Sequence, residues 1–305
     1  MGLILNDLKN ACELEHVCDY VNNRTTSSMN YISTENMLPN KGGISESTII
    51  PPGTTTEYKI GDILISNIRP YFQKIWCADR CGGCSADVLC IRAKENTDSK
   101  YLYYLLSQQA FFDYVMSGAK GCKMPRGDKK QIMQWPVNIP AIDVQKKVVA
   151  ILSSLDNKIR LNRRINDNLE EQAKALFNHY FIQNTENLGE WQDGVLTDIA
   201  QYLNGLAMQK YPAMPNEAGL PVLKIKELGQ GQCDTNSDRC SSLIKPEYII
   251  SDGTIIFSWS GTLLVDIWCG GKCGLNQHLF KVSSAKYPQW FVFYWTKHHL
   301  NKPVG

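Results

Sequence analysis

A heptad pattern of apolar positions runs through the middle of the chain, between Pro140 and Phe181. Its positions are separated by alternating steps of four and three residues over more than four heptads, which is typical of a helix that packs against another helix. The seam consists of Val148, Leu152, Leu155, Ile159, Asn162, Asn166, Leu169, Ala173, Leu176 and Tyr180. Asp143 can cap the helix, and neither proline nor glycine interrupts it before Gly189. The pattern therefore predicts a stiff helix from Asp143 to Phe181, roughly 58 Å long at ~1.5 Å per residue.

Two seam positions in the middle of this helix are asparagines, Asn162 and Asn166. An asparagine in a coiled-coil seam lowers stability but fixes the register and the partner. The cations beside them are Lys158, Arg160, Arg163 and Arg164. A solvated helix face accounts for these charges better than a DNA contact does, and the exposed seam itself requires a partner helix.

A second pattern is an internal repeat on either side of the helix. When residues 61–82 are shifted by 192 positions, eight of 22 residues are identical, where chance would give roughly one. The identities are Gly61/Gly253, Ile63/Ile255, Ser66/Ser258, Ile75/Ile267, Trp76/Trp268, Cys77/Cys269, Cys81/Cys273 and Gly82/Gly274. Leu14–Asn23 also resembles Leu196–Gly205, and Tyr101–Leu106 aligns with Phe291–Thr296. Ordered matches at three places indicate a duplicated domain.

Each copy has the pattern of a mixed α and β domain. The runs “DILIS” at 62–66 and “TIIFSWS” at 254–260 are β-branched or aromatic and follow glycine, which predicts strands. Lys100–Tyr114 has apolar residues at helical spacing and predicts one amphipathic helix. The expected fold class is α+β, with two homologous mixed α/β domains separated by a long coiled-coil-forming helix. The expected boundaries are 1–139, 140–183 and 184–305.

Composition adds few constraints. The 305 residues are 43% hydrophobic and 20% charged, so each half can bury a core, and the net charge of +2 requires any basic surface to be local. No window approaches 18 consecutive apolar residues, so we expect no membrane span. The first ten residues lack the features of a secretion signal, and the expected compartment is the cytoplasm.

The sequence contains no recognisable catalytic constellation or cofactor motif. Asp62 corresponds to Thr254 in the second copy, so a duplicated catalytic carboxylate is unsupported. Eleven cysteines are present, and the suggestive cluster is Cys77, Cys81, Cys84 and Cys90. A zinc enzyme built on these four remains an alternative, although free thiols account for them better because no histidine lies at finger-like spacing. We expect no catalytic residue, no cofactor and no bound metal.

Two homologous domains on a stiff spacer suit a long, charged, repetitive ligand such as DNA, whose half-sites lie a fixed distance apart. The loop at 118–131 carries five cations against one acid: Lys120, Lys123, Arg126, Lys129 and Lys130 are the expected phosphate contacts. Base contacts should lie where the copies diverge, at Asn67, Arg69 and Tyr71 after the first strand and at Trp259 after the second. Further candidates, chosen by charge, are Arg24, Lys210, Lys224 and Lys226.

At these residues the chain resembles the specificity subunits of type I restriction-modification systems. The resemblance rests on “GDILIS” at 61–66, “CSADVLCIR” at 84–92 and “LNQHLFKV” at 275–282. Its most specific part is “NIPAIDVQKKVVAILSSLDNKIRLNRRINDNLEEQAKALF” at 138–177, which is similar to the central region of the family. The resemblance implies two target recognition domains that each read half of a split sequence in double-stranded DNA. It also implies partner methyltransferase subunits and a restriction subunit, which would hold S-adenosylmethionine, ATP and magnesium and perform the chemistry.

Two departures from the family pattern change the expectation. Val144 stands where the family often has glutamate before Gln145, which affects only a local cap or docking contact. The second copy is also short: at an offset of 190, Gly305 corresponds to Val115, so a second basic loop and a second long helix are missing. The helix should therefore pair with that of a second chain, giving a homodimer. The alternatives are an inactive truncated fragment and a protein-interaction scaffold without catalysis.

Overall fold

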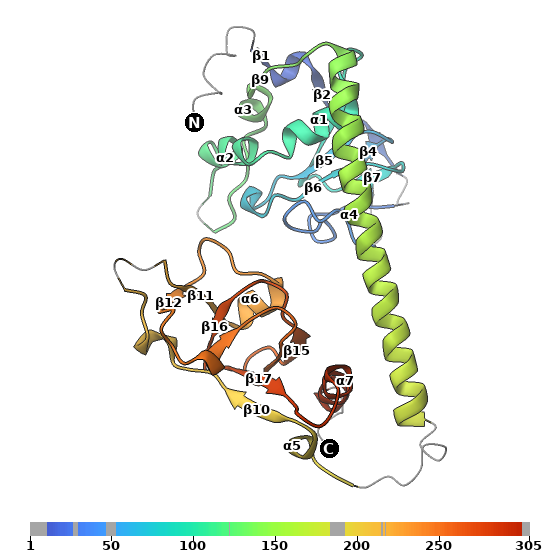
Figure 1. Ribbon diagram of the computed structural model, residues 1–305. Helices are drawn as coiled ribbons and strands as arrows, with labels where there is room; N and C mark the ends of the chain where they lie inside the picture. The colour runs from blue at the N-terminus through green and yellow to red at the C-terminus, as the bar shows by residue number, and fades with distance from the viewer. Residues whose placement is uncertain are drawn as a thin grey trace. The chain divides into compact units, whose positions relative to one another are not determined.

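The computed structural model describes residues 11–26, 30–46, 53–121, 123–183, 193–214, 216 and 218–300. The start of the third predicted domain, at 184, lies outside these ranges. The chain divides into two compact units, Met1–Arg163 and Arg164–Gly305, and the long helix α4 (Ile142–Phe177) contributes residues to both. Figure 1 labels the elements of each unit.

The centre of the first unit is a four-stranded antiparallel sheet with the order β2-β8-β5-β6. Its strands are Cys18–Tyr20 (β2), Val88–Ala93 (β8), Ile63–Ser66 (β5) and Ile75–Cys77 (β6). Strand β5 is buried along its whole length, as expected for a central strand made of “ILIS”. The predicted strand at 62–66 is confirmed.

A smaller three-stranded sheet, with the order β3-β4-β7, adjoins this one. It is formed by Arg24–Thr25 (β3), Thr55–Tyr58 (β4) and Gly82–Cys84 (β7), and Ile32 adds a parallel bridge to Cys84. A separate two-stranded ladder joins Cys12–Glu13 (β1) to Pro136–Val137 (β9). The short 3-10 helices Leu14–His16 (η2) and Pro70–Phe72 (η3) complete the connections.

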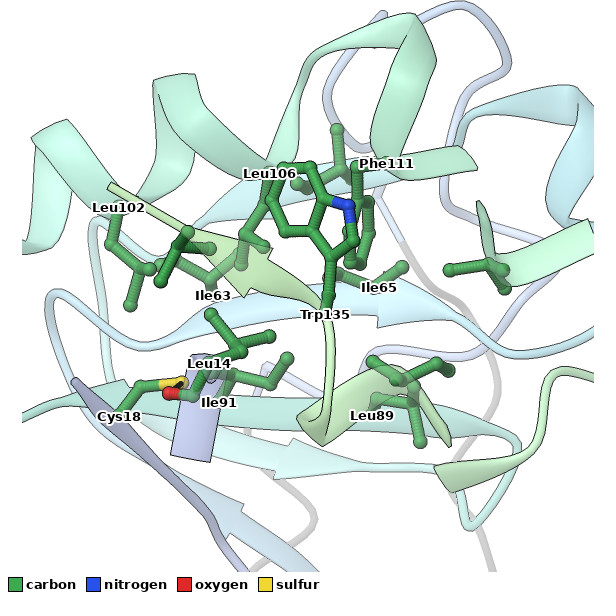
Figure 2. Close-up of a cluster of buried hydrophobic side chains, with 14 of the residues drawn as sticks. Leu14, Cys18, Ile63, Ile65, Leu89, Ile91, Leu102, Leu106, Phe111 and Trp135 are labelled. Atoms are coloured by element: carbon green, nitrogen blue, oxygen red, sulfur yellow. Dashed lines mark hydrogen bonds between the residues drawn. The ribbon is translucent and has the colours of Figure 1, made fainter. Parts of the chain in front are cut away.

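Helices α1 (Ser99–Leu106), α2 (Gln109–Ser117) and α3 (Lys129–Met133) cover the main sheet of this unit. The prediction of one helix over Lys100–Tyr114 is wrong, because the chain turns at Ser107 and Gln108 is extended. Because of this turn, Leu102 and Leu106 of α1 enter the same core as Phe111 of α2. A straight helix would point Phe111 away from that core. Figure 2 shows these side chains packed with Trp135 against Ile63 and Ile65.

An ion pair with a buried carboxylate joins the two central strands of the main sheet, with Asp62 just before β5 and Arg92 in β8. Asp62 is almost completely buried and accepts two hydrogen bonds from Arg92, both 2.7 Å long, and one from the Lys59 amide. The bidentate geometry satisfies a carboxylate that would otherwise be costly to bury. Asp62 therefore has a structural role in the first unit, and its counterpart Thr254 instead donates to the Ser251 carbonyl.

The second unit repeats this arrangement. Its main antiparallel sheet has the order β10-β17-β14-β15, which matches β2-β8-β5-β6 strand for strand. The strands are Gln201–Asn204 (β10), Leu279–Ser283 (β17), Ile255–Ser258 (β14) and Leu264–Ile267 (β15). Helix α7 (Gln289–Leu300) packs on this sheet through Val292 and Phe293, as α1 does in the first unit. The predicted duplication is confirmed at the level of topology.

The backbone pairing changes the alignment of the repeat beyond the central strand, and the last strand of the sheet is offset by 191, since Ser66 pairs with Val88 and Ser258 with Leu279. In the first unit, the Ala78 amide donates to the Asp62 carbonyl, and the Ala78 carbonyl accepts from the Gly61 amide. In the second unit, the Trp268 amide donates to the Thr254 carbonyl, and the Trp268 carbonyl accepts from the Gly253 amide. Trp268 therefore occupies the position of Ala78, not that of Trp76. The hairpin that follows the central strand is two residues shorter in the second unit, so the shift of 192 misplaces Ile75, Trp76 and Cys77.

The second unit also has a smaller sheet, with the order β12-β11-β16-β13. Its strands are Arg239–Cys240 (β12), Leu220–Leu223 (β11), Cys273–Leu275 (β16) and Ile249–Ile250 (β13). The remaining elements are α5 (Leu196–Ile199), α6 (Ile225–Gln230), η6 (Met208–Lys210) and η7 (Pro246–Tyr248). The parallel pairing of β11 with β16 corresponds to the bridge between Ile32 and Cys84.

Helix α4 confirms the predicted long helix, and a π-helical turn at Asn178–Gln183 (η4) extends it. Its first turn is fixed to the first unit by Gln145, whose fully buried amide bonds Asp98, Asn96 and Pro140. In the second unit, Phe177 near its end packs on Tyr294 and Trp295 of α7. Between these points the seam is open to solvent, with Leu155, Ile159, Leu169 and Leu176 each 50–58% exposed. Among the described helices, none is both long enough and apolar enough to cross a membrane.

Candidate nucleic-acid interface

Three loops of the first unit meet where strands β5 and β6 are joined. The Arg69 amide donates to the Pro125 carbonyl over 2.8 Å, and Ile68 forms a bridge with Arg126. The Asn40 amide donates to the Phe72 carbonyl, also over 2.8 Å. These bonds bring the predicted base contacts Arg69 and Tyr71 together with the predicted phosphate loop.

The basic loop is a small hairpin stabilised by backbone hydrogen bonds and by ion pairs. Lys120 and Arg126 pair through both backbone groups, and the Lys120 ammonium lies 3.0 Å from Asp128. Arg126 lies 3.1 Å from Asp87. Both cations remain largely exposed, and Lys123 is exposed at the tip. The bond from Lys120 and two backbone amides of α3 hold the pKa of Asp128 below its usual range. The loop thus presents three exposed cations, two of them held by ion pairs.

The remaining predicted DNA contacts of the first unit lie outside the hairpin formed by residues 120–126. Asn67 is 8% exposed and its side-chain oxygen is buried beneath Gly127, so this side chain is not on the surface. Lys129 donates to the Tyr20 hydroxyl over 2.6 Å and lies above its ring. With Lys130 and Glu15 these two residues line a shallow groove of about 430 Å³. Arg24 is exposed on β3, in the smaller sheet.

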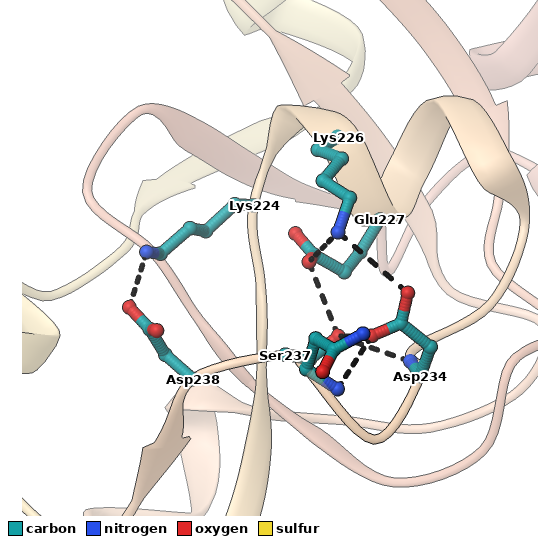
Figure 3. A network of polar contacts seen from close by, with 7 residues as sticks. Lys224, Lys226, Glu227, Asp234, Ser237 and Asp238 are labelled. Atoms are coloured by element: carbon teal, nitrogen blue, oxygen red, sulfur yellow. Dashed lines mark hydrogen bonds and ion pairs between the residues drawn. The ribbon is translucent and has the colours of Figure 1, made fainter. Parts of the chain in front are cut away.

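In the second unit, two of the predicted cations are engaged by neighbouring acids. Lys224 pairs with Asp238, and Lys226 lies 3.6 Å from Asp234 and 3.9 Å from the buried Glu227 (Figure 3). The bond from Lys224 lowers the pKa of Asp238. Ser237 also donates to Glu227 over 3.1 Å. Three acids flank these two lysines, whereas Asp87 and Asp128 are the acids that pair with the five-cation loop of the first unit, so this surface should attract phosphate less strongly than that loop.

Trp259 and Lys210 are the remaining predictions for the second unit. Trp259 is 43% exposed at the tip of the hairpin between β14 and β15, with its ring 6.0 Å from that of His278. Lys210 is exposed at the end of η6. Trp259 therefore occupies the same place in its unit as the loop after β5 does in the first.

Two residues at the hairpin between β5 and β6, Phe72 and Lys74, were not among the contacts predicted from the sequence. Phe72 is 38% exposed beside Tyr71, with ring centroids 4.6 Å apart. Lys74 donates to the Thr34 carbonyl over 2.7 Å, and burial together with the nearby Arg69 lowers its pKa. The sequence signal was available, because Phe72 follows Tyr71 directly in the segment where the two copies diverge.

The thiols that suggested a zinc site do not converge on one. Cys84 and Cys90 are buried, whereas Cys81 is exposed. Burial raises the pKa of Cys77 to about 11 and that of Cys84 to about 12, which disfavours the thiolate that zinc requires. Within the described ranges, no three His, Cys, Asp or Glu side chains are arranged to hold a metal ion, so the zinc alternative has no geometric support there.

The paired α/β units and the long helix are a known architecture. The crystal structure of the S subunit of a type I restriction-modification system from M. genitalium superposes with a TM-score of 0.50. The match covers 98% of this chain and 79% of that one at 13% sequence identity, so it establishes the shared fold alone.

Residues 9–171 match the family described as the type I restriction modification DNA specificity domain. This span is more than half of the chain, and the protein belongs to that family.

Two curated relatives carry specificity-subunit names. The type I restriction enzyme MjaIX specificity subunit of Methanocaldococcus jannaschii is 26% identical over 189 residues, which are 56% of this chain and 44% of that protein. The HindI specificity subunit of Haemophilus influenzae is 29% identical over 161 residues, which are 50% of this chain and 35% of that protein. The matched part thus spans less than half the length of either relative.

Proposed function

We propose that this chain is a DNA-recognition subunit whose two repeated units each read one part of a bipartite double-stranded target. The observation that carries the proposal is the convergence of Arg69, Tyr71 and the loop of Lys120, Lys123 and Arg126 in one unit of this family. Cations position a protein on the phosphates, and neighbouring polar and aromatic side chains read the base edges. The recognition domains would span 1–139 and 184–305, joined by a spacer helix at 140–183.

In this proposal the chain performs no chemistry itself. It would direct methyltransferase subunits and a restriction subunit to the DNA, and these partners would supply the cofactors and the catalytic groups. The absence of a catalytic constellation in the sequence supports this division of labour, as do the specificity-subunit names of the relatives. Such a complex would act in the cytoplasm.

We further propose that the seam of α4 pairs with the same helix of a second chain. Leu155, Ile159, Leu169 and Leu176 are each about half exposed, and burying the exposed half of such a side chain is worth about 0.8–1.5 kcal/mol. Asn162 and Asn166 would set the register of the pair. Light scattering at micromolar concentration should give twice the chain mass, and Leu155→Glu combined with Leu169→Glu should return the monomer. A stable wild-type monomer would rule the pairing out.

Salt dependence distinguishes DNA recognition from a protein scaffold. With five phosphate contacts by the basic loop and α3, log K for duplex DNA should fall with log salt with a slope of about −4.5, because each contact releases about 0.9 of a counterion. An apolar protein interface responds weakly to salt. Fluorescence anisotropy on a duplex of random sequence measures the slope, and Lys120→Gln, Lys123→Gln and Arg126→Gln together should reduce its magnitude by about 3. Salt-independent or undetectable binding would favour the scaffold alternative.

A further inference from the structure

The loop between β5 and β6 presents two neighbouring aromatic rings to solvent. Tyr71 is 48% exposed and Phe72 is 38% exposed, and both lie in η3 at the tip of the hairpin. Their apolar faces are solvated in the free chain, so a surface that covered them would gain hydrophobic free energy.

The rings are held in place by backbone that is strained and cross-linked. Arg69 (φ 50°) and Gln73 (φ 51°), which flank η3, are both left-handed, a conformation that is unfavourable for a non-glycine residue. Asn40 and Lys41, with φ of 53° and 61°, donate to the carbonyls of Phe72 and Gln73. Four left-handed residues therefore meet at one point, and strain concentrated in this way is typical of functional sites.

The cations near the rings are Arg69, Lys74 and Lys123, and Glu35 is an acid near Lys74. Arg69 is exposed and forms no ion pair within the described part of the chain, and the Lys74 ammonium lies 5.9 Å from the centre of the Phe72 ring. Lys123 is exposed on the adjoining hairpin. An apolar tip framed by cations fits a ligand with apolar atoms set between rows of negative charge.

We propose that the Tyr71–Phe72 tip reads thymine methyl groups in the major groove of the half-site bound by the first unit. This inference rests on the proposed DNA-recognition function. The major groove admits a two-stranded β-ribbon, and the C5-methyl of thymine is the apolar group that it displays between the phosphate rows. Lys123 would contact a flanking phosphate, Arg69 would contact a neighbouring base edge, and the rings would cover the methyl group.

The equivalent hairpin of the second unit differs in shape. Its connection, 259–263, is shorter, and its left-handed residue is Gly261 (φ 66°), which carries no strain. It carries Trp259 with the ring near His278, in place of two adjacent rings. The two units therefore present different tips from the same framework, and the thymine readout belongs to the first half-site alone.

Removing methyl groups from the DNA tests the inference. Duplexes bound by the full chain are selected from a random pool, and each thymine of the selected site is replaced in turn by uracil, which lacks the methyl group. Burying one methyl changes affinity about fourfold. The wild type should lose about that factor at one or two positions of one half-site. Tyr71→Ala combined with Phe72→Ala should bind the thymine duplex more weakly and show no further loss with uracil.

Controls separate the possible failures. Tyr180→Ala removes a ring of equal exposure from η4 and should keep the full uracil effect. Tyr71→Ala and Phe72→Ala are also tested singly, and their melting temperatures should match that of the wild type because both rings are exposed. An unchanged uracil penalty in the double variant, or no uracil effect in either half-site, overturns the methyl readout while DNA recognition stands. A wild-type chain that selects no sequence removes the proposed function and this inference with it.

Discussion

Replacing Gln145 with leucine should destabilise the first unit by about 3 kcal/mol. The side chain is completely buried, accepts from the Asp98 amide over 2.8 Å, and donates to the Asn96 and Pro140 carbonyls over 3.1 and 2.8 Å. Leucine has a similar size but leaves three backbone groups without partners, and each unsatisfied buried group costs about 1–3 kcal/mol. Since Asp98 also caps α1, the change loosens the joint between α1 and the first turn of α4.

Calorimetry measures this effect as a fall of about 6–12 °C in the melting temperature of the first unit. Hydrogen exchange should localise it, with faster exchange at the start of α4 than in the strands. Lys146→Ala, an exposed neighbour on the same turn, should change stability by less than about 0.5 kcal/mol. If Gln145→Leu is as stable as the wild type, the hydrogen bonds do not hold the helix to the unit.

The second large effect should follow from Phe177→Ala at the other end of the helix. Phe177 is 4% exposed and stacks on Tyr294 with ring centroids 5.4 Å apart, with Trp295 at the same distance. Truncating a buried phenylalanine costs about 3–5 kcal/mol. The loss should lie near 3 kcal/mol, because the aromatic rings of α7 can partly close the cavity.

The melting transition of the second unit should therefore fall by about 6–12 °C, while that of the first unit stays unchanged. Lys174→Ala is the matched control, since Lys174 is exposed one turn earlier. An intermediate loss is expected for Phe177→Leu, which keeps most of the buried area. A variant that shifts both transitions equally would mean that the two units do not unfold independently.

The sequence was most informative where a pattern repeats many times. The seam of α4 recurs over four heptads, and the duplicated strands at 63–66 and 255–258 recur on the same framework, so helix, strands and duplication could all be predicted. The start of α4 could be recognised in the sequence, because it lies in the segment that resembles the central region of the family. Its physical basis, the three hydrogen bonds of Gln145, required the tertiary structure because Asp98 and Asn96 lie far away in the sequence.

The errors arose where tertiary contacts override local pattern. The apolar spacing of Lys100–Tyr114 is helical throughout, yet the core can receive both Leu106 and Phe111 only if the helix breaks. Ile75, Trp76 and Cys77 were misaligned because a hairpin can lose two residues without losing its strands. These two errors left the predicted fold class unchanged.

The candidate site was only partly accessible to sequence reasoning. Charge counts pointed to Lys224 and Lys226, but the acids that pair with them come from a loop whose approach the sequence does not reveal. Similarly, nothing in the sequence distinguishes the buried Asn67 from the exposed Arg69 two residues later. The left-handed residues at Asn40, Lys41, Arg69 and Gln73 are not glycines, so the usual signal for such turns is absent.

We propose that the two repeated units and one stiff helix together recognise a divided sequence in DNA. Sequencing the duplexes that the full chain retains from a random pool, at low and at physiological salt, tests it most directly. The predicted result is a motif of two specified parts separated by a gap of constant length and unspecified sequence. A retained pool with no enriched sequence, or with a single uninterrupted motif, would contradict the account.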